Sequence, residues 1–101
     1  MKVLWTDTAI SQLEQIFYYY SHKASSKVAT RLTQQIVDKT LLLETFPRTG
    51  QRENFLIDRE REYHYLVEGH YKILYWVEGK FVKIASVFDC RQNPEKMLEI
   101  E

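Results

Sequence analysis

The sequence is poor in cysteine, proline and glycine, and it has no long apolar run. One cysteine, Cys90, excludes a disulfide framework and a zinc site built from several cysteines, and it is typical of a reducing compartment. No apolar run approaches the roughly 18 residues that a membrane span needs. The N-terminal segment MKVLWTDTA is polar where a signal peptide is apolar. We therefore expect a cytoplasmic protein that has no membrane partner.

The sequence has no excess of positive or negative charge, because 14 Lys and Arg residues balance 14 Asp and Glu residues. This neutrality argues against nucleic-acid binding driven by bulk charge, although it is compatible with a local basic patch. Residues 95–101 carry three glutamates and one lysine, which leaves a net charge of +2 on residues 1–94. The length of 101 residues is that of one domain. We expect this domain over residues 1–94, followed by an acidic C-terminal tail over residues 95–101.

Two helices are predicted before the break at Pro47 and Gly50. The first has Thr6 or Asp7 as its N-cap, and the second begins at Ser25 or Ser26. The apolar stripe of the first helix consists of Ala9, Leu13, Ile16, Phe17 and Tyr20. That of the second consists of Ala29, Leu32, Ile36, Thr40 and Leu43. Because the link between them is short, the two helices should pack as an antiparallel hairpin.

After Gly50 the pattern changes to alternation, and two Glu-Gly pairs ten residues apart predict turns. The predicted elements are three meander strands, Arg59 to Val67, Tyr71 to Val77 and Phe81 to Asp89, and an N-terminal strand, Lys2 to Trp5. A two-helix hairpin needs a surface to cover. We therefore predict an α+β fold of order β-α-α-β-β-β, with the helical hairpin on one face of a small antiparallel sheet and the other face open.

Alternation assigns side chains to the two faces of this sheet. Tyr71, Ile73, Tyr75 and Val77 of the middle strand should face the helices, together with Ala85 and Val87 of the last strand. Lys72, Leu74, Trp76, Ile84, Ser86 and Phe88 should then face the open side. The first meander strand leaves the alternatives undecided: either Tyr63 and Tyr65 or His64 and Leu66 are on the buried side. An exposed Trp76 would mark a contact surface for a partner or a base.

The order of these elements, together with Trp5-Thr6-Asp7-Thr8-Ala9, the Tyr71-Lys72-Ile73-Leu74-Tyr75 strand and the closing run from Ile84 to Pro94, resembles the RelE/ParE toxin superfamily. The similarity covers nearly the whole chain. It implies the toxin of a type II toxin-antitoxin module with a role in plasmid or chromosomal stabilisation. It also implies a cognate antitoxin that wraps the toxin in a hetero-oligomer and holds it inactive. For Trp76, we favour coverage by this antitoxin or by the C-terminal tail over stacking of a base.

The superfamily has two activities, and the resemblance leaves open whether this chain is an enzyme. RelE-like members cleave mRNA on the ribosome with basic side chains. The residues that would do so here are Arg61, Lys72 and Arg91. Tyr63 and Tyr65 stand where lysines are expected, however, and Asp89 would repel a phosphate.

ParE-like members bind DNA gyrase, and such binding needs no catalytic set. We favour this branch, with mRNA cleavage and an inactive binding module as alternatives. The candidate binding residues are Arg59, Tyr63, Tyr65, Trp76 and Phe88. No cofactor and no metal ligand set is indicated. We expect His64 to be structural and Cys90 to be a buried or half-buried thiol.

Overall fold

The computed structural model describes residues 1–100, so Glu101, the last residue of the predicted tail, lies outside the described residues. No helix within the described part is long and apolar enough to cross a membrane. The elements are β1 (Lys2–Trp5), α1 (Asp7–Lys23), α2 (Ser26–Thr45), β2 (Gln51–Arg52), the 3₁₀ helix η1 (Asn54–Leu56), β3 (His64–Glu68), β4 (Tyr71–Glu78), β5 (Phe81–Asp89) and the 3₁₀ helix η2 (Pro94–Glu99).

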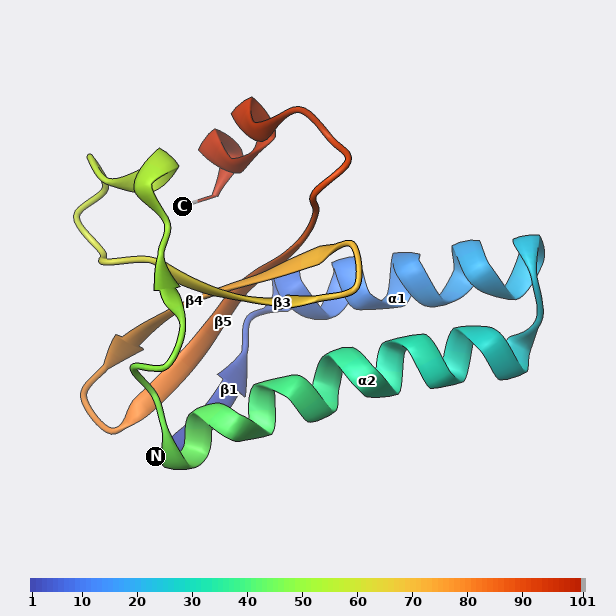
Figure 1. The fold of residues 1–101 in the computed structure, drawn as a ribbon, viewed down its shortest axis with the longest axis horizontal. Coiled ribbons are helices and arrows are strands. Elements are labelled where there is room, and N and C mark those ends of the chain that lie inside the picture. Colours follow the sequence, from blue (N-terminus) through green and yellow to red (C-terminus); the bar gives the residue numbers. More distant parts are fainter. Residues whose placement is uncertain (101) are drawn as a thin grey trace.

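The five strands form one sheet in the order β1-β5-β4-β3-β2. The helical hairpin packs against one face of this sheet, and η1 and η2 lie at the other face (Figure 1). The predicted α+β fold is confirmed. Two details differ: β1 runs parallel to β5, which makes the sheet mixed, and the two-residue strand β2 adds a fifth strand at the edge.

The helix starts are confirmed, because each predicted cap side chain satisfies a backbone N–H group of the first turn. Thr6 Oγ1 accepts a hydrogen bond from Ala9 N at 3.2 Å, and Ser25 Oγ accepts one from Val28 N at 3.1 Å. Thr6 Oγ1 also donates to the carbonyl oxygen of Ile84 at 2.8 Å. The first cap therefore joins the start of α1 to strand β5.

The core between the helices and the sheet follows the predicted stripes. Ile36 and Leu43 of α2 are fully buried against Ile73 and Tyr75 of β4. Burial of each such aliphatic side chain contributes roughly 1.5–3 kcal/mol. The two predicted turns are also present, since Gly69 and Gly79 are the two glycines with positive φ, at 59° and 60°.

The second face of the sheet is not open, and this corrects the prediction. A second apolar cluster covers it, and Trp76 retains only 7% of its exposure. The members of this cluster come from β4, β5, η1, η2 and the loop before β3. They are Leu56, Tyr63, Leu74, Trp76, Ala85, Phe88 and Met97. Alternation assigned Trp76 to the correct face, but it gave no information about segments that would cover that face.

The assignment of faces on β5 was wrong at one point, because a β-bulge interrupts the alternation. Leu74 pairs with Ser86 and Tyr75 pairs with Ile84, so Ala85 has no partner of its own on β4. Ile84 therefore belongs to the helix-facing cluster, and Ala85 belongs to the second cluster. The predicted placement of Val87 on the helix side is confirmed.

The first meander strand begins at His64, five residues later than predicted. Leu66 packs in the helix-facing cluster, and Tyr65 packs against the second cluster, which settles the alternative that the sequence left open. The ring of His64 stacks on the ring of Tyr75 at 5.9 Å between centroids. Cys90 is exposed, not buried as expected, because it lies just beyond the end of β5.

Candidate functional site

Most of the predicted binding residues lie on the second face of the sheet. Tyr63 and Phe88 are buried beside Trp76, and the Tyr63 and Trp76 rings meet edge to face at 6.0 Å between centroids. Met97 of η2 is buried in the same cluster, and Ile100 packs against it. The nominated aromatic side chains thus form an interior, and the C-terminal segment separates them from solvent.

Two cations flank the Trp76 ring. The Arg61 guanidinium carbon lies 4.2 Å from the ring centre, and Lys83 Nζ lies 5.9 Å from it. Lys83 Nζ also donates a hydrogen bond to Glu78 Oε2 at 2.7 Å, which lowers the pKa of the Glu78 carboxyl group. The indole ring is therefore held by charged groups whose heads lie toward solvent.

Lys72 lies in a different part of this face and is neutralised there. Its Nζ atom donates to Glu53 Oε2 at 2.8 Å and lies 4.3 Å from the centre of the Tyr65 ring. Glu53 is 5% exposed, and its other oxygen accepts a hydrogen bond from Phe55 N. This is an ion pair between strand β4 and the start of η1, and it holds η1 over the sheet.

Arg91 is paired within its own turn. Its Nη2 and Nε atoms donate to the two oxygens of Asp89 at 2.8 and 3.0 Å. This fork holds the pKa of the Asp89 carboxyl group below its usual value and raises the pKa of Arg91. Nearby, burial and a hydrogen bond with Tyr20 raise the pKa of Tyr71 well above its usual value.

Arg59 binds the chain itself. Its two terminal nitrogens donate hydrogen bonds to the carbonyl oxygens of Leu98 and Ile100. These two hydrogen bonds attach the C-terminal segment to the loop before β3. The four predicted cations therefore do not converge on one point. Arg59 holds the C-terminal segment, Arg61 lies on Trp76, Lys72 pairs with Glu53, and Arg91 pairs with Asp89.

Three residues that organise this face were not identified from the sequence. Gln12 Oε1 accepts hydrogen bonds from Val87 N at 2.8 Å and Ser86 Oγ at 3.0 Å, beside the bulge in β5. Glu53 is the buried partner of Lys72. Met97 belongs to an apolar group, with Leu98 and Ile100, inside an otherwise acidic tail. These apolar residues are the sequence feature that could have indicated packing of the tail on the sheet.

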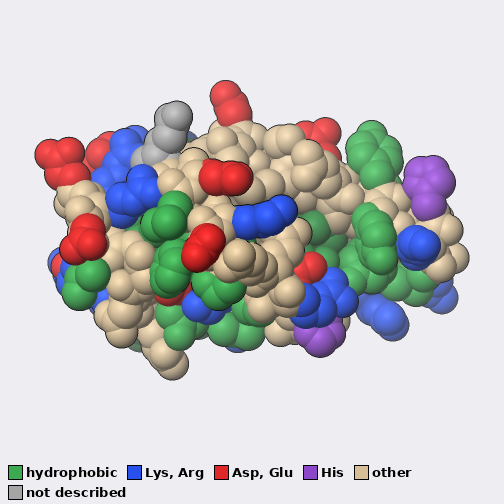
Figure 2. Space-filling view, turned by 90° about the horizontal axis from the view of Figure 1, so that it is seen from above, with side chains coloured by type: hydrophobic (Ala, Val, Ile, Leu, Met, Phe, Trp, Pro, Cys, Tyr) green, Lys and Arg blue, Asp and Glu red, His purple; other side chains and the backbone are tan. Residues whose placement is uncertain are grey.

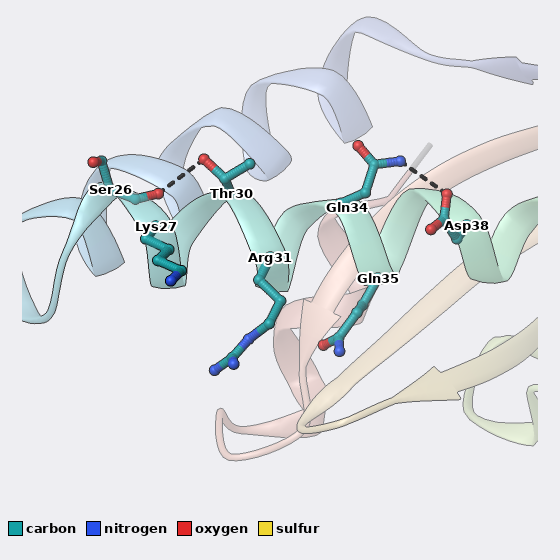
Figure 3. Close-up of a pocket in the computed structure, with 7 residues that line it drawn as sticks. All are labelled: Ser26, Lys27, Thr30, Arg31, Gln34, Gln35 and Asp38. Atoms are coloured by element: carbon teal, nitrogen blue, oxygen red, sulfur yellow. Dashed lines mark hydrogen bonds between the residues drawn. The ribbon is translucent and has the colours of Figure 1, made fainter.

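A cleft of 690 Å³ lies between η2, the start of α1 and the sheet. Its lining is mainly polar and includes Thr6, Gln12, Ser86 and Lys96 besides Trp76. A further surface hollow of 560 Å³ runs along α2 (Figure 3), but all its lining side chains belong to that one helix and are exposed. There Gln34 donates to Asp38 at 2.8 Å, as is usual on a solvated helix face.

Comparison with known proteins identifies the family. A family model described as the ParE toxin of the type II toxin-antitoxin system, parDE, matches residues 3–94. The chain belongs to the ParE toxin family. This ParE-family chain is also similar in fold to a chain of the chromosomal ParDE TA system from P. aeruginosa, with a TM-score of 0.74 and 20% identity. The match covers 88% of this chain and 95% of that chain.

No curated protein matches the sequence of this ParE-family chain. The family match ends at residue 94, where η2 begins. Most of the segment that covers the second face, including Met97, therefore lies beyond the matched region.

Proposed function

We propose that this ParE-family chain is the toxin of a type II toxin-antitoxin pair and that it arrests growth by binding DNA gyrase. The observation that carries the choice of target is the separation of the candidate cations. Lys72 and Arg91 each form an ion pair with a carboxylate, and Arg59 binds backbone carbonyls of its own chain. Binding to a protein surface requires no assembled catalytic group, whereas cleavage of RNA does.

Cleavage of mRNA needs cations that converge where negative charge develops on the phosphate. Here Lys72 forms an ion pair with the Glu53 carboxylate, and Arg91 forms one with the Asp89 carboxylate. The face that carries the C-terminal segment also has acidic and basic side chains interspersed (Figure 2). A polyanion would meet repulsion as well as attraction on such a surface, and this favours a protein target.

A cognate antitoxin is the second part of the proposal. The matched family model describes toxins of parDE modules, and the similar solved structure is of a ParDE system. We propose that the cognate antitoxin binds this chain as a hetero-oligomer and prevents access to gyrase. The proposal includes action in the cytoplasm, where gyrase and a cognate antitoxin would both be present.

The target is tested with purified protein in two parallel assays. One measures DNA supercoiling by gyrase, and the other measures translation of a reporter mRNA together with primer extension on ribosome-bound mRNA. We expect loss of supercoiling or trapped DNA cleavage complexes, with translation intact at the same dose. New mRNA ends with supercoiling unaffected would overturn the gyrase proposal and favour ribosome-dependent cleavage.

The toxin role is tested by expression in cells. Induction should stop growth, and co-expression of the small reading frame adjacent to the toxin gene should restore growth and yield a co-purifying complex. An unrelated antitoxin serves as the control. If induction left growth unaffected, the chain would be an inactive binding module and the toxin proposal would fail.

A further inference from the structure

The C-terminal segment lies across the second face of the sheet on the side opposite the helices (Figure 1). Its residues 94–99 form the 3₁₀ helix η2, and a 3₁₀ helix of this length has poorer hydrogen-bond geometry than an α-helix. Met97 enters the second cluster and is 2% exposed, whereas its neighbour Leu98 is 52% exposed. Met97 is therefore the one fully buried apolar side chain of residues 94–100, and the partly buried Ile100 packs beside it.

A second attachment comes from Arg59, which donates hydrogen bonds to the carbonyl oxygens of Leu98 and Ile100. Arg59 lies in the loop before β3 and not in the sheet, so it holds the segment from the side. Within the segment itself, Lys96 N and Ile100 N donate to carbonyls three residues earlier. These local bonds shape η2 but do not attach it to the rest of the molecule.

The segment covers the face without filling the space beneath it. The cleft of 690 Å³ is partly open to solvent and lies between η2 and the sheet, so η2 does not pack closely on the whole of this face. Under the same cover, Trp76 Nε1 is buried, and its interaction with the Glu78 carboxylate falls short of normal hydrogen-bond geometry. By contrast, Ile36 and Leu43 on the helix face are fully buried in a continuous cluster.

The two apolar clusters are structurally distinct. They lie on opposite faces of one sheet and have no buried residue in common. Loss of the contacts of Met97 therefore leaves the contacts of Ile36, Leu43 and Tyr75 in place. Such an arrangement permits local opening of one segment without global unfolding.

We propose that residues 94–100 are a strap that opens and closes over the second face of the sheet, and that Met97 and Arg59 hold it closed. In the closed state the strap shields Trp76, Phe88 and Tyr63 from water. In the open state this aromatic surface is exposed while the helices and the sheet remain folded. The inference does not rest on gyrase as the target, since it concerns an equilibrium of the chain alone.

The test uses the full-length chain with Trp5→Phe, which leaves Trp76 as the remaining tryptophan of the two. Met97→Ser and Arg59→Gln each remove one attachment. Leu98→Ser and Arg48→Gln are the matched controls, because Leu98 and Arg48 are exposed. Acrylamide quenching of Trp76 reports opening of the strap, and amide hydrogen exchange compares Ile100 with α2.

We expect Met97→Ser and Arg59→Gln to increase the exchange rate at Ile100 about ten-fold or more and to raise Trp76 quenching, with exchange in α2 unchanged. The control variants should match the parent. Two results would overturn the proposal: quenching of Trp76 that is the same in all variants, or exposure of Trp76 that occurs only when protection in α2 is lost as well. Arg59→Gln leaves the apolar cluster intact, so it decides the question if Met97→Ser does not fold.

Discussion

The guanidinium group of Arg61 lies 4.2 Å from the centre of the Trp76 ring, and it covers an indole that strand β4 directs away from the helices. Arg61, a predicted catalytic residue, thus contacts Trp76, a predicted binding residue. The contact is a cation–π interaction at the rim of the second cluster.

Replacing Arg61 tests the strength of this contact. Arg61→Ala should lower the free energy of unfolding by about 0.5–1 kcal/mol, because the interaction lies at a partly solvated rim. Chemical denaturation measures the change, and the Trp76 fluorescence maximum should shift because the indole loses its charged neighbour. Arg48→Ala is the control and should have no effect. If Arg61→Ala left both stability and fluorescence unchanged, the contact would not persist in solution.

The ion pair between Lys72 and Glu53 should contribute more than a surface pair. Glu53 is nearly fully buried, so Glu53→Ala removes the partner of Lys72 and should cost about 3 kcal/mol. The exposed pair of Arg52 and Glu62 gives the comparison, and Glu62→Ala should cost less than about 1 kcal/mol. Urea unfolding compares the two. Equal costs would contradict the assignment of Glu53 as a buried partner.

Asp89 should make stability depend on pH in the acidic range. Its pKa is lower in the folded state than its unperturbed value of 3.8, because Arg91 donates hydrogen bonds to it. The folded state therefore binds this proton less readily than the unfolded state. The stabilisation is present above about pH 4 and is lost as the pH falls through the folded pKa.

Thermal melts of the parent and of Asp89→Asn measure this contribution. The difference in melting temperature should be constant from pH 5 to neutral pH and should shrink below about pH 4, since only the parent loses a charge there. A difference that grew on acidification would contradict the sign of the shift.

Gly50 should not accept any side chain. A Cβ atom there would lie 2.4 Å from Tyr75 Oη and 2.7 Å from the carbonyl oxygen of Tyr65. Tyr75 is fully buried and cannot move aside, so Gly50→Ala should cost about 2–3 kcal/mol. Gly69→Ala is the matched control: it has a positive φ but open space around it, and it should cost about 1 kcal/mol. Comparable losses in urea unfolding would refute the steric explanation.

Growth assays with the variants Lys72→Gln and Arg91→Gln test whether toxicity depends on the predicted catalytic residues. Both variants retain polar side chains that can reach Glu53 and Asp89. Because Lys72→Gln leaves the buried Glu53 carboxylate without its cation, circular dichroism first checks that this variant is folded. If toxicity comes from binding gyrase, each variant should arrest growth within about two-fold of the parent dose, because no catalytic charge has been removed. Loss of killing by a folded variant that still binds its antitoxin would identify the changed residue as part of a ribonuclease site.

The local order of this protein could be predicted from its residues. Thr6 and Ser25 cap the helices as expected, and Ile36 and Leu43 lie on the buried stripe. The Glu-Gly pairs form the turns at Gly69 and Gly79. These features depend on residues a few positions apart, and the helical and strand periods express them directly.

The candidate site could be predicted only in part. Trp76 and Phe88 were assigned to the second face, and both belong to its cluster. Coverage of Trp76 by the C-terminal tail was one of the alternatives, but the sequence did not indicate that Met97 is the residue that enters this face from an otherwise acidic segment. Nor could the pairing of Lys72 with Glu53 be foreseen, since it joins residues 19 positions apart across an irregular segment.

Sequence alone determined the helical stripes, the turns and the alternation along β4, because each follows from the geometry of a single element. The tertiary structure decided the rest. A bulge beside Leu74 moved Ala85 to the second face, and Met97 closed that face against water. Such outcomes depend on the relative free energies of contacts between distant segments, and no local period encodes them.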